Sequence, residues 1–370
     1  MYRIDSPKIS EARTPPVSIV IPIYNEDHHL PETISKLREI NYPNNKLQII
    51  LSYERSSTDQ SRQIAKNAAE GSEVFEVLKH DSPLGGKAKN VNYALNHTSG
   101  EIIGIIDADM RVEDDLIRRV VGWFSTKPDL SCLRGQTYAY NSDDSVLALH
   151  AAVERDLVEI ADVYARELIG GFKLYGGGHA FFRQSVFERI GKLDETVLID
   201  DLEMSARLFI SDEEMKIDPN IVTYGENPPT FAGWWQQRKR WYLGLIQVAK
   251  KYTKISVLTQ SSNLWGGVDL LITLSYWTAP LIILPLTPIL FIGVIQSTTI
   301  IFTKMNIVSI ILLLYILPFV IIYTIYIRDI VGGRTHSIKK FFVPITFWPY
   351  MFIELTIWLH TFVELVVEKK

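Results

Sequence analysis

The hydropathy of the chain changes sharply about two thirds of the way along its 370 residues. Residues 1–255 mix charged and apolar side chains, as a water-soluble α/β domain does, whereas residues 264–363 are mostly Leu, Ile, Val, Phe, Trp and Pro. A helix of about 20 apolar residues is long enough to cross a bilayer. The last third therefore predicts a membrane-embedded helical region instead of a second soluble domain.

Three apolar blocks divide this region: Gly267–Ile295, which contains prolines, Ile307–Ile327 and Phe341–Val363. The loop Arg328–Lys340 carries four Arg or Lys residues, so the positive-inside rule predicts that it is cytoplasmic. If the N-terminal domain is cytoplasmic too, an even number of passes must precede this loop. Two spans satisfy that condition, giving three in all. Splitting the first block into two short passes, giving four, would place the loop outside.

Charge and cysteine content exclude some classes of protein. The formal net charge of −4 argues against a nucleic-acid partner. Cys132 is the only cysteine, so the chain predicts neither an internal disulfide nor a cysteine metal site. The first residues, Met1–Pro16, are polar and lack the apolar core of a signal peptide. These features favour an integral membrane protein whose soluble domain lies on the cytoplasmic face.

Strand-like and helix-like runs alternate through the first 106 residues, a pattern that predicts an α/β fold with a parallel, doubly wound sheet. The remainder of the soluble part is less regular, and Ser145–Leu168 predicts one long amphipathic helix. Trp234–Lys251 is basic and aromatic and predicts a helix lying on a membrane surface. The expected strands are Val17–Tyr24, Leu47–Leu51, Glu73–Leu78 and Glu101–Ile106, and the expected domains are 1–232, 233–263 (interfacial) and 264–370 (transmembrane).

Asp107-Ala108-Asp109 directly follows one of the predicted strands. Ligands of doubly wound sheets bind at the carboxyl ends of the strands. Two carboxylates at that edge could hold a hard divalent cation against a diphosphate and so stabilise it as a leaving group. The alternative is a loop that merely begins with a helix-capping aspartate.

Three further segments fall at the same predicted edge. Tyr24-Asn25-Glu26 and Glu54 follow the first two strands, where their side chains could accept hydrogen bonds from a base or ribose, or could serve ordinary turns. Leu84-Gly85-Gly86-Lys87 leads into a predicted helix, and its glycines and lysine suit an anion. An ordinary loop with a solvated lysine explains that last segment almost as well.

The remaining candidates come later in the chain. Asp200-Asp201 opens a predicted helix, and Asp201 could take the proton of an attacking hydroxyl or simply cap the helix. The run from Gln237 to Trp241 could hold phosphate and stack on a sugar, or could be a basic membrane-facing stretch. His179, after three glycines, could contact an acceptor or could be a core histidine.

Taken in order, these motifs resemble glycosyltransferase family 2, the inverting enzymes with a GT-A fold, from about Val17 to Tyr252. The family's Pro-x-Tyr-Asn-Glu is matched by Pro22, Tyr24 and Glu26, and its Asp-x-Asp by Asp107 and Asp109. Its Thr-Glu-Asp appears as Ile199-Asp200-Asp201, without the threonine. Where the family usually has Asp-Asp-Gly-Ser-x-Asp, residues 54–59 read Glu-Arg-Ser-Ser-Thr-Asp, so Arg55 departs from the pattern. The Gln-x-x-Arg-Trp signature of its membrane-bound branch, which includes cellulose, chitin and hyaluronan synthases and ceramide glucosyltransferase, is matched by Gln237, Arg238, Arg240 and Trp241.

The resemblance implies a membrane-bound, metal-dependent sugar transferase that uses a nucleotide-diphosphate sugar, with UDP the expected nucleotide. Mg²⁺ or Mn²⁺ would be bound by Asp109 and Asp107, and Asp201 would be the catalytic base. The nucleotide would be held by Pro22, Tyr24, Glu26, Glu54, Lys87 and Asp107. The diphosphate and acceptor would be held by His179, Asp200, Gln237, Arg238, Arg240 and Trp241.

The acceptor is less determined by the sequence. About three spans are few for one subunit to form a polymer channel, which favours a membrane lipid as acceptor. A processive polysaccharide synthase is the alternative, and assembly of several subunits would make it feasible. A membrane scaffold with an inactive transferase domain is a third hypothesis, which the intact Asp107, Asp109 and Asp201 oppose. Product length separates the first two hypotheses, and nucleotide binding separates both from the third.

Overall fold

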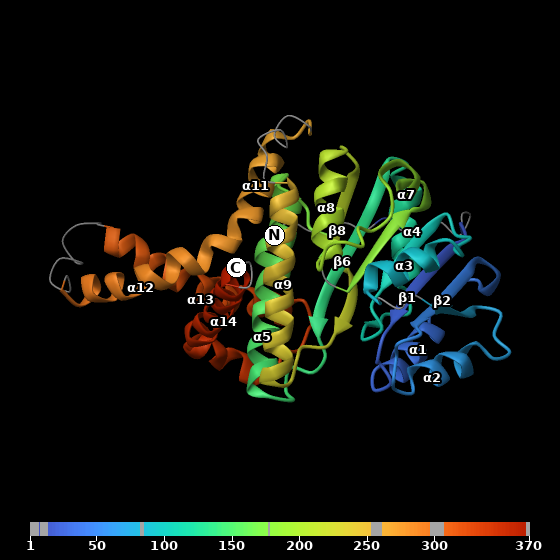
Figure 1. The fold of residues 1–370 in the computed structure, drawn as a ribbon, viewed down its shortest axis with the longest axis horizontal. Coiled ribbons are helices and arrows are strands. Elements are labelled where there is room, and N and C mark those ends of the chain that lie inside the picture. The colour runs from blue at the N-terminus through green and yellow to red at the C-terminus, as the bar shows by residue number, and fades with distance from the viewer. Residues whose placement is uncertain are drawn as a thin grey trace. The chain divides into compact units, whose positions relative to one another are not determined.

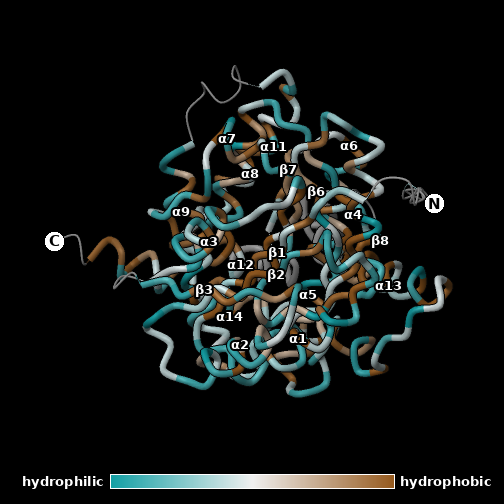
Figure 2. Tube along the Cα trace, turned by 90° about the vertical axis from the view of Figure 1, so that its right-hand side faces the viewer, coloured by the Kyte–Doolittle hydropathy of each residue, from teal (hydrophilic) through white to brown (hydrophobic). Residues whose placement is uncertain are grey.

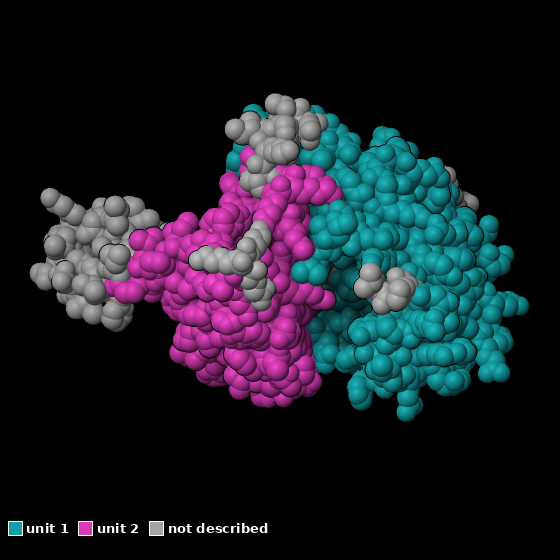
Figure 3. Space-filling model, viewed as in Figure 1, with its two compact units in different colours: residues 1–140, 163–226, 254–270 teal, residues 141–162, 227–253, 271–370 magenta. Residues whose placement is uncertain are grey.

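The computed structural model describes residues 7, 14–81, 85–176, 178–252, 261–296 and 307–367, and the side chains of 289–315 are not among them. The chain forms two compact units (Figure 3). The first comprises residues 1–140, 163–226 and 254–270, and the second comprises 141–162, 227–253 and 271–370. These units are interleaved along the chain, whereas the sequence predicted three consecutive domains.

The first unit is built on a mixed sheet whose eight strands lie in the order β3-β2-β1-β4-β7-β6-β8-β5 (Figure 1). The strands are β1 Val17–Ile23, β2 Leu47–Glu54, β3 Phe75–His80, β4 Ile102–Ile106, β5 Arg111–Val112, β6 Leu130–Ala139, β7 His179–Arg183 and β8 Glu214–Gly225. Strands β1 to β4 pair in parallel, as predicted. The rest of the sheet corrects the expectation of a wholly parallel sheet, because β7 is antiparallel to both of its neighbours and β5 to β8.

Helices cover both faces of this sheet because alternate strand residues point to opposite faces. In β1, Ile19 and Ile21 belong to one buried cluster and Val20 to another. The first cluster includes residues of α1, α2 and α4, and the second includes residues of α3, α7 and α8. Their bounds are α1 Leu30–Arg38, α2 Ser61–Ala69, α3 Lys87–Leu95, α4 Leu116–Thr126, α7 Gln184–Ile190 and α8 Asp200–Ile210, and a short 3-10 turn spans Asn44–Lys46.

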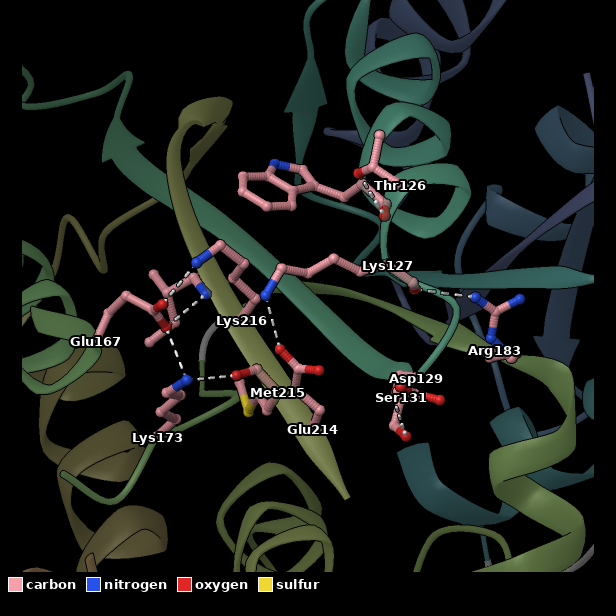
Figure 4. Close-up of polar contacts among 12 residues, drawn as sticks. Thr126, Lys127, Asp129, Ser131, Glu167, Lys173, Arg183, Glu214, Met215 and Lys216 are labelled. Atoms are coloured by element: carbon pink, nitrogen blue, oxygen red, sulfur yellow. Dashed lines mark hydrogen bonds and ion pairs between the residues drawn. The ribbon is translucent and has the colours of Figure 1, made fainter. Parts of the chain in front are cut away.

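The long helix predicted over Ser145–Leu168 is divided into three parts: α5 Val146–Leu157, a π-helical stretch Val158–Tyr164 and α6 Ala165–Ile169. Helix α6 is tied to the sheet unit through its glutamate. In Figure 4 the ammonium groups of Lys173 and Lys216 point to Glu167, at 3.0 and 2.8 Å. The ion pair with Lys216, 49 residues away, fixes the end of the segment, and local helical periodicity gives no sign of it.

The second unit is helical. Its helices are α5, α9 Phe231–Tyr252, α12 Ala279–Gln296, α13 Ile307–Val331 and α14 Val343–Val367, with 3-10 turns at Tyr276–Thr278 and Ile338–Phe342. Helix α11 Leu264–Ser275 begins in the first unit and ends in the second. Figure 2 colours most of α12 and α13 as hydrophobic. A buried cluster that includes Trp234, Tyr326 and Phe347 forms the core of this unit.

Two helical stretches among the described residues, Leu264–Pro288 and Ile338–Val367, are long and apolar enough to cross a membrane, judged by length and composition alone. They overlap the first and third predicted spans. The second predicted span, Ile307–Ile327, lies in α13, but the side chains of its first nine residues are outside the described set. Helix α9 coincides with the helix predicted over Trp234–Lys251. Much of its apolar side is buried and contacts α14, as in the 5.0 Å pair of rings Tyr242 and Trp358, and its position at a membrane surface stays a prediction.

Candidate active site

The carboxyl ends of six strands meet at one edge of the first unit. Strands β1, β2, β3 and β4 are parallel, and the two antiparallel pairings of β7 bring β6 and β8 back to the same direction. Residues that follow these strands are therefore gathered at one edge, where ligands of α/β sheets bind. The polar residues that end these strands or follow them within three positions include Tyr24, Glu26, Glu54, His80, Asp107, Asp109, Tyr140 and Glu226.

The loops after β1 and β2 are hydrogen-bonded to each other. The Asn25 side-chain oxygen accepts from the backbone of Thr58 at 2.8 Å, and the Glu26 backbone donates to the Ser61 hydroxyl at 2.7 Å. Asn25 has a φ of 55°, a left-handed conformation that asparagine tolerates better than most residues. This bonding fixes the backbone that carries Glu26. Pro22 lies within β1, before the loop.

The residues predicted to bind the nucleotide differ in exposure along this edge. Tyr24 is exposed, so its ring is free to contact a ligand. Glu54 is buried, and its Oε1 accepts from the backbone of Gly86 at 2.9 Å. A Cβ on Gly85 would lie 2.0 Å from Glu54 Oε2, so a larger residue there would force this carboxylate to move. Glu54 thus holds the loop that precedes Lys87, while Leu84 of the predicted anion-binding segment lies outside the described residues.

Lys87, the first residue of α3, contacts Asp107 with 2.6 Å between Nζ and Oδ1. Burial alone would lower the pKa of Lys87, but the nearby Asp107 and Asp200 outweigh it, and the pKa lies well above its usual value. Lys87 is therefore a permanent cation among carboxylates. The structure thus brings together Lys87, Asp107 and Asp200, which are far apart in the chain.

Asp200 and Asp201 open α8 in different environments. Asp201 is half-buried, and its Oδ1 accepts from the backbone of Leu202 at 2.7 Å. Asp200 is buried, and this burial raises the pKa of its carboxyl against the opposing effect of Lys87. Its Oδ2 is buried and accepts no hydrogen bond among the described residues. Asp200 can thus accept a hydrogen bond that this fold leaves unmade.

Negative charge is concentrated around Glu26. Burial raises the pKa of Glu26 from 4.5 to about 8, and the charges of Asp109, Asp107 and Glu226 add to the effect. The contribution of these neighbours shows that several negative charges lie close together at this edge. A divalent cation or the ammonium of a ligand would relieve this repulsion.

The donor set fits a hard divalent cation that is shared with a substrate. No three His, Cys, Asp or Glu side chains in the described parts of the chain form a complete metal site. Magnesium is commonly bound by one or two carboxylates together with substrate phosphates and water. Asp107 and Asp109 can supply those one or two carboxylates, and the charge around Glu26 favours a cation there.

Tyr175 is a residue of this edge that the sequence analysis did not identify. It is buried, and its backbone donates to the Ser205 hydroxyl of α8 at 2.7 Å. Burial raises the pKa of its phenol well above the usual value, while Lys87 opposes the shift and Asp200 adds to it. In the sequence, only the position of Tyr175 directly before a run of glycines indicated a functional role, because small residues let a bulky neighbour approach a site.

His179 is a core residue, which corrects its predicted contact with an acceptor. It is fully buried, its Nε2 accepts from the backbone of Gly135 at 3.0 Å, and its Nδ1 lies 3.0 Å from the Thr223 hydroxyl. Burial lowers the pKa of His179 to about 3, and Arg134 adds to the effect. A neutral imidazole that is bonded on both nitrogens stabilises the sheet and is closed to substrate.

Arg238 also differs from its predicted contact with diphosphate. Its side chain in α9 is 3% exposed and is bound by Glu154 at 2.5 Å, by the hydroxyl of Tyr350 at 3.1 Å and by Glu354 at 3.5 Å. Its guanidinium also lies 4.3 Å from the centre of the Trp241 ring. With two carboxylates around it, Arg238 holds the helices of the second unit together.

The other members of the predicted Gln-x-x-Arg-Trp motif are more accessible. Gln237 is half-buried, Arg240 is exposed, and the Trp241 side chain is 37% exposed. One face of Trp241 is engaged by Arg238. Gln237, Arg240 and Trp241 therefore keep atoms that a ligand can reach, and their contacts with a sugar or a phosphate stay predictions.

Comparison with known proteins identifies relatives of this arrangement. Residues 18–191 match the model of the family described as Glycosyl transferase family 2. The poly-beta-1,6-N-acetyl-D-glucosamine synthase of Staphylococcus epidermidis is 24% identical over 256 residues, which cover 67% of this chain and 59% of that protein. The beta-monoglucosyldiacylglycerol synthase of Synechocystis is 26% identical over 237 residues, 63% of this chain and 48% of that protein. The chain thus spans about half of the length of these curated relatives.

Solved structures share the fold. The mannosyltransferase PcManGT from Pyrobaculum calidifontis, solved with GDP-Man and Mn²⁺, superposes with a TM-score of 0.60 at 17% identity, covering 98% of this chain and 90% of that one. TarS of S. aureus, residues 1–349 with UDP-GlcNAc, gives a TM-score of 0.52 at 13% identity, covering 71% and 73%. At these identities the likeness establishes a GT-A fold.

Proposed function

The chain belongs to glycosyltransferase family 2, and from this premise we propose that it transfers a sugar from a nucleotide-diphosphate donor, most simply a UDP-sugar, to a membrane lipid, forming a β-glycosidic bond. The observation that carries the proposal is the convergence of Glu26, Asp107, Lys87 and Asp200 at one edge of the sheet. That edge has acceptors for a nucleoside, carboxylates for a cation and a lysine for phosphate.

The donor would lie along the parallel half of the sheet. Tyr24 offers an exposed aromatic face to the base, and the fixed loop beneath Glu26 offers polar atoms to the ribose. Glu54 would act by holding the Gly85-Gly86 loop in place, and Lys87 at the start of α3 would face the phosphates. Solved structures with this fold contain UDP-GlcNAc and GDP-Man, so a nucleotide sugar is the class of donor expected.

Asp109 and Asp107 would hold Mg²⁺ or Mn²⁺ on the diphosphate. The cation, when bound, would supply Lewis-acid stabilisation of the leaving group. Asp107 contributes in a second way, because its contact with Lys87 keeps the ammonium at the site. The lysine charge also offsets part of the negative charge that a bound diphosphate brings.

Asp201 would act as the general base. Its carboxylate would take the proton of the acceptor hydroxyl while that oxygen attacks the anomeric carbon and the bond from this carbon to the diphosphate breaks. Attack from the face opposite the leaving group inverts an α-linked donor into a β-glycoside. Asp200, with its unused oxygen Oδ2, would accept a hydrogen bond from a substrate hydroxyl.

The choice of a lipid acceptor rests on the hydrophobic helices and on the relatives. Two stretches can cross a membrane by length and composition, and curated relatives include beta-monoglucosyldiacylglycerol synthases. The exposed Arg240 and Trp241 of α9 would contact the acceptor or the diphosphate. The protein would thus be an integral membrane enzyme with its catalytic unit on the cytoplasmic face.

A processive polysaccharide synthase is the second candidate, because curated relatives also include poly-beta-1,6-N-acetyl-D-glucosamine synthases. Detergent-purified protein, incubated with UDP- and GDP-sugars, Mn²⁺ or Mg²⁺ and membrane lipid extract, separates the candidates when the products are sized by mass spectrometry. Lipids that gain one or two sugars support the proposal. A ladder of long glycans would establish the second candidate, and absence of turnover with every donor would contradict both.

A further inference from the structure

Four large apolar side chains of the first unit are exposed at the end of α6 and the start of α11. They are Leu168, Ile169, Leu264 and Trp265, with exposed fractions of 46, 59, 63 and 52%. Exposed apolar side chains are ordinary when scattered, but a group of large ones marks an interaction surface. We call these four residues the apolar tip.

The two halves of the apolar tip are joined by a hydrogen bond, although nearly a hundred residues separate them. The Asn263 side chain, directly before Leu264, donates to the carbonyl of Gly170, directly after Ile169, at 2.8 Å. Gly170 has a left-handed φ of 70° and ends α6. The turn after α6 and the first turn of α11 therefore form one local surface.

Below the tip, an aspartate of α11 is paired with the segment after α6. Asp269 Oδ2 lies 3.3 Å from Arg166 Nε and accepts from the backbone of Phe172 at 2.8 Å. A Cβ on Gly171 would lie 2.7 Å from the same oxygen, so the glycine permits this close approach. Arg166 and Asp269 are both largely buried. The start of α11 is thus fastened to α6 by buried charges.

The ion pair of Arg166 and Asp269 bears on how deeply the first unit would sit in a membrane. Asp269 lies inside Leu264–Pro288, one of the two stretches able to cross a membrane. An unpaired carboxylate in hydrocarbon is costly, so a membrane aspartate requires a partner at the same depth. Arg166 is that partner. When α11 enters the lipid, the segment from Arg166 to Phe172 must come to the same level, with the apolar side chains beside it.

We propose that the apolar tip inserts into the lipid surface and seats the catalytic unit on the membrane, with Arg166 and Asp269 as its polar base. Trp265 suits such a position, because tryptophan favours the boundary between hydrocarbon and headgroups. The tip also lies only six residues before Tyr175 in the chain, so lipid contact is linked to the proposed active site by a short segment. The inference rests on the membrane attachment contained in the proposed function.

The test uses the single cysteine of the chain. Cys132 is buried, so Cys132→Ala gives a cysteine-free background into which one labelling site is introduced. Ile169→Cys would be labelled with an environment-sensitive fluorophore, and the full-length protein reconstituted in nanodiscs with and without spin-labelled lipids. Leu168→Cys is a second tip position in case the first variant does not fold. Ile345→Cys, 76% exposed in α14, reports membrane attachment itself, and Lys66→Cys, exposed in α2, is the water-facing control.

The proposal predicts that the label at residue 169 shifts to shorter wavelength on reconstitution and loses at least half of its emission to the lipid quencher, whereas the label at residue 66 does neither. Quenching at 345 but not at 169 or 168 would overturn the tip while leaving membrane attachment intact. No quenching at either residue would contradict both. A blue shift at 169 that lipid quenchers do not reach, and that grows with protein concentration, would overturn the tip and assign it to contact between two copies of the chain.

Discussion

Each unit contains one cluster of charged residues. Both clusters include a cation that the sequence predicts to bind phosphate, but the cations pair with their carboxylates in different ways. At the sheet edge of the first unit, Lys87 faces several carboxylates, and burial together with the charges of Asp109 and Asp107 raises the pKa of Glu26 to about 8. In the second unit Arg238 is surrounded by Glu154, Glu354 and the hydroxyl of Tyr350. In the second cluster the guanidinium is within ion-pair distance of both carboxylates, whereas in the first cluster Lys87 contacts Asp107 and further carboxylates lie around them.

The arrangement of charges distinguishes a binding site from a group of ion pairs that only stabilises the fold. A buried ion pair that has its partners within the fold needs no ligand, and removal of one partner leaves a costly unpaired charge. Several carboxylates that share one edge with a single lysine leave negative charge that a bound cation can neutralise, and buried carboxylates with raised pKa values, such as Glu26 and Asp200, gather at functional sites. Substitutions at the sheet edge should therefore reduce activity while the fold stays stable. Substitutions in the Arg238 network should lower the stability of the fold while UDP binding is kept.

The largest expected effect is on turnover at the sheet edge. Asp201→Asn should lower the rate of sugar transfer by about 10²- to 10⁴-fold, the usual contribution of a general base, since the amide cannot accept the proton. The thermal midpoint should stay within a degree or two, because Asp201 is half-buried. Rates by mass spectrometry and midpoints by scanning fluorimetry provide the check, with the exposed Asp114→Asn as control. A variant that kept a tenth of the activity would show that another residue is the base.

The second effect is on the stability of the helical unit. Arg238→Met leaves Glu154 and Glu354 without their cation, a change that costs about 3–5 kcal/mol at buried pairs, and we expect a fall of roughly 5 °C or more in the thermal midpoint. Lys239→Met, the next residue of α9, removes a solvent-accessible pair with Glu364 and should leave the midpoint unchanged. Equal midpoints for the two variants would contradict the structural role of Arg238.

A smaller effect is expected where the Gly85 loop touches Glu54. Gly85→Ala places a methyl group 2.0 Å from Glu54 Oε2, so the carboxylate must move away from its hydrogen bond with Gly86. If the loop then holds the nucleotide about 1.4 kcal/mol less well, the affinity falls roughly tenfold. Shortening the partner in Gly85→Ala/Glu54→Asp should restore part of the affinity. Titration calorimetry with UDP measures both. If the single variant bound UDP as tightly as the natural protein, the loop would have no part in holding the nucleotide.

The smallest effect concerns pH. Glu26 holds a proton up to about pH 8 in the folded protein but only to about 4.5 when unfolded, so between these values the folded state binds more protons. The stability of the metal-free protein should therefore fall as pH rises through this window. Glu26→Gln should flatten that fall, whereas the exposed Glu70→Gln should not. Thermal midpoints measured between pH 5 and 8.5 would contradict the charge excess if all three proteins gave parallel curves.

The sequence predicted those features that depend on neighbouring residues. The first four strands and the polar residues that end them are read from short apolar runs, and the strands pair in parallel as expected. Family membership also follows from the ordered motifs, and the family match confirms it. Asp107 and Lys87 were both predicted, although their contact is a product of topology.

Features that depend on distant partners were not predictable. The basic run of α9 reads as a phosphate site because Glu154 and Glu354, the partners of Arg238, are 84 and 116 positions away. His179 follows glycines as an active-site residue can, but it is neutral and enclosed between strands. Antiparallel β7 lies in the middle of the sheet, between β4 and β6, and hydropathy does not reveal the order of strands.

The most direct test of the different roles of the two charged clusters is UDP binding, measured by calorimetry in the presence of Mn²⁺. One charge variant from each cluster is compared with the natural protein. We predict that Asp107→Asn/Asp109→Asn abolishes metal-dependent binding without lowering the thermal midpoint, while Arg238→Met lowers the midpoint but binds UDP with unchanged affinity below its unfolding temperature. Binding that survived the double aspartate variant but was lost with Arg238→Met would contradict a donor site at the sheet edge, and it would place the donor on α9 in the second unit.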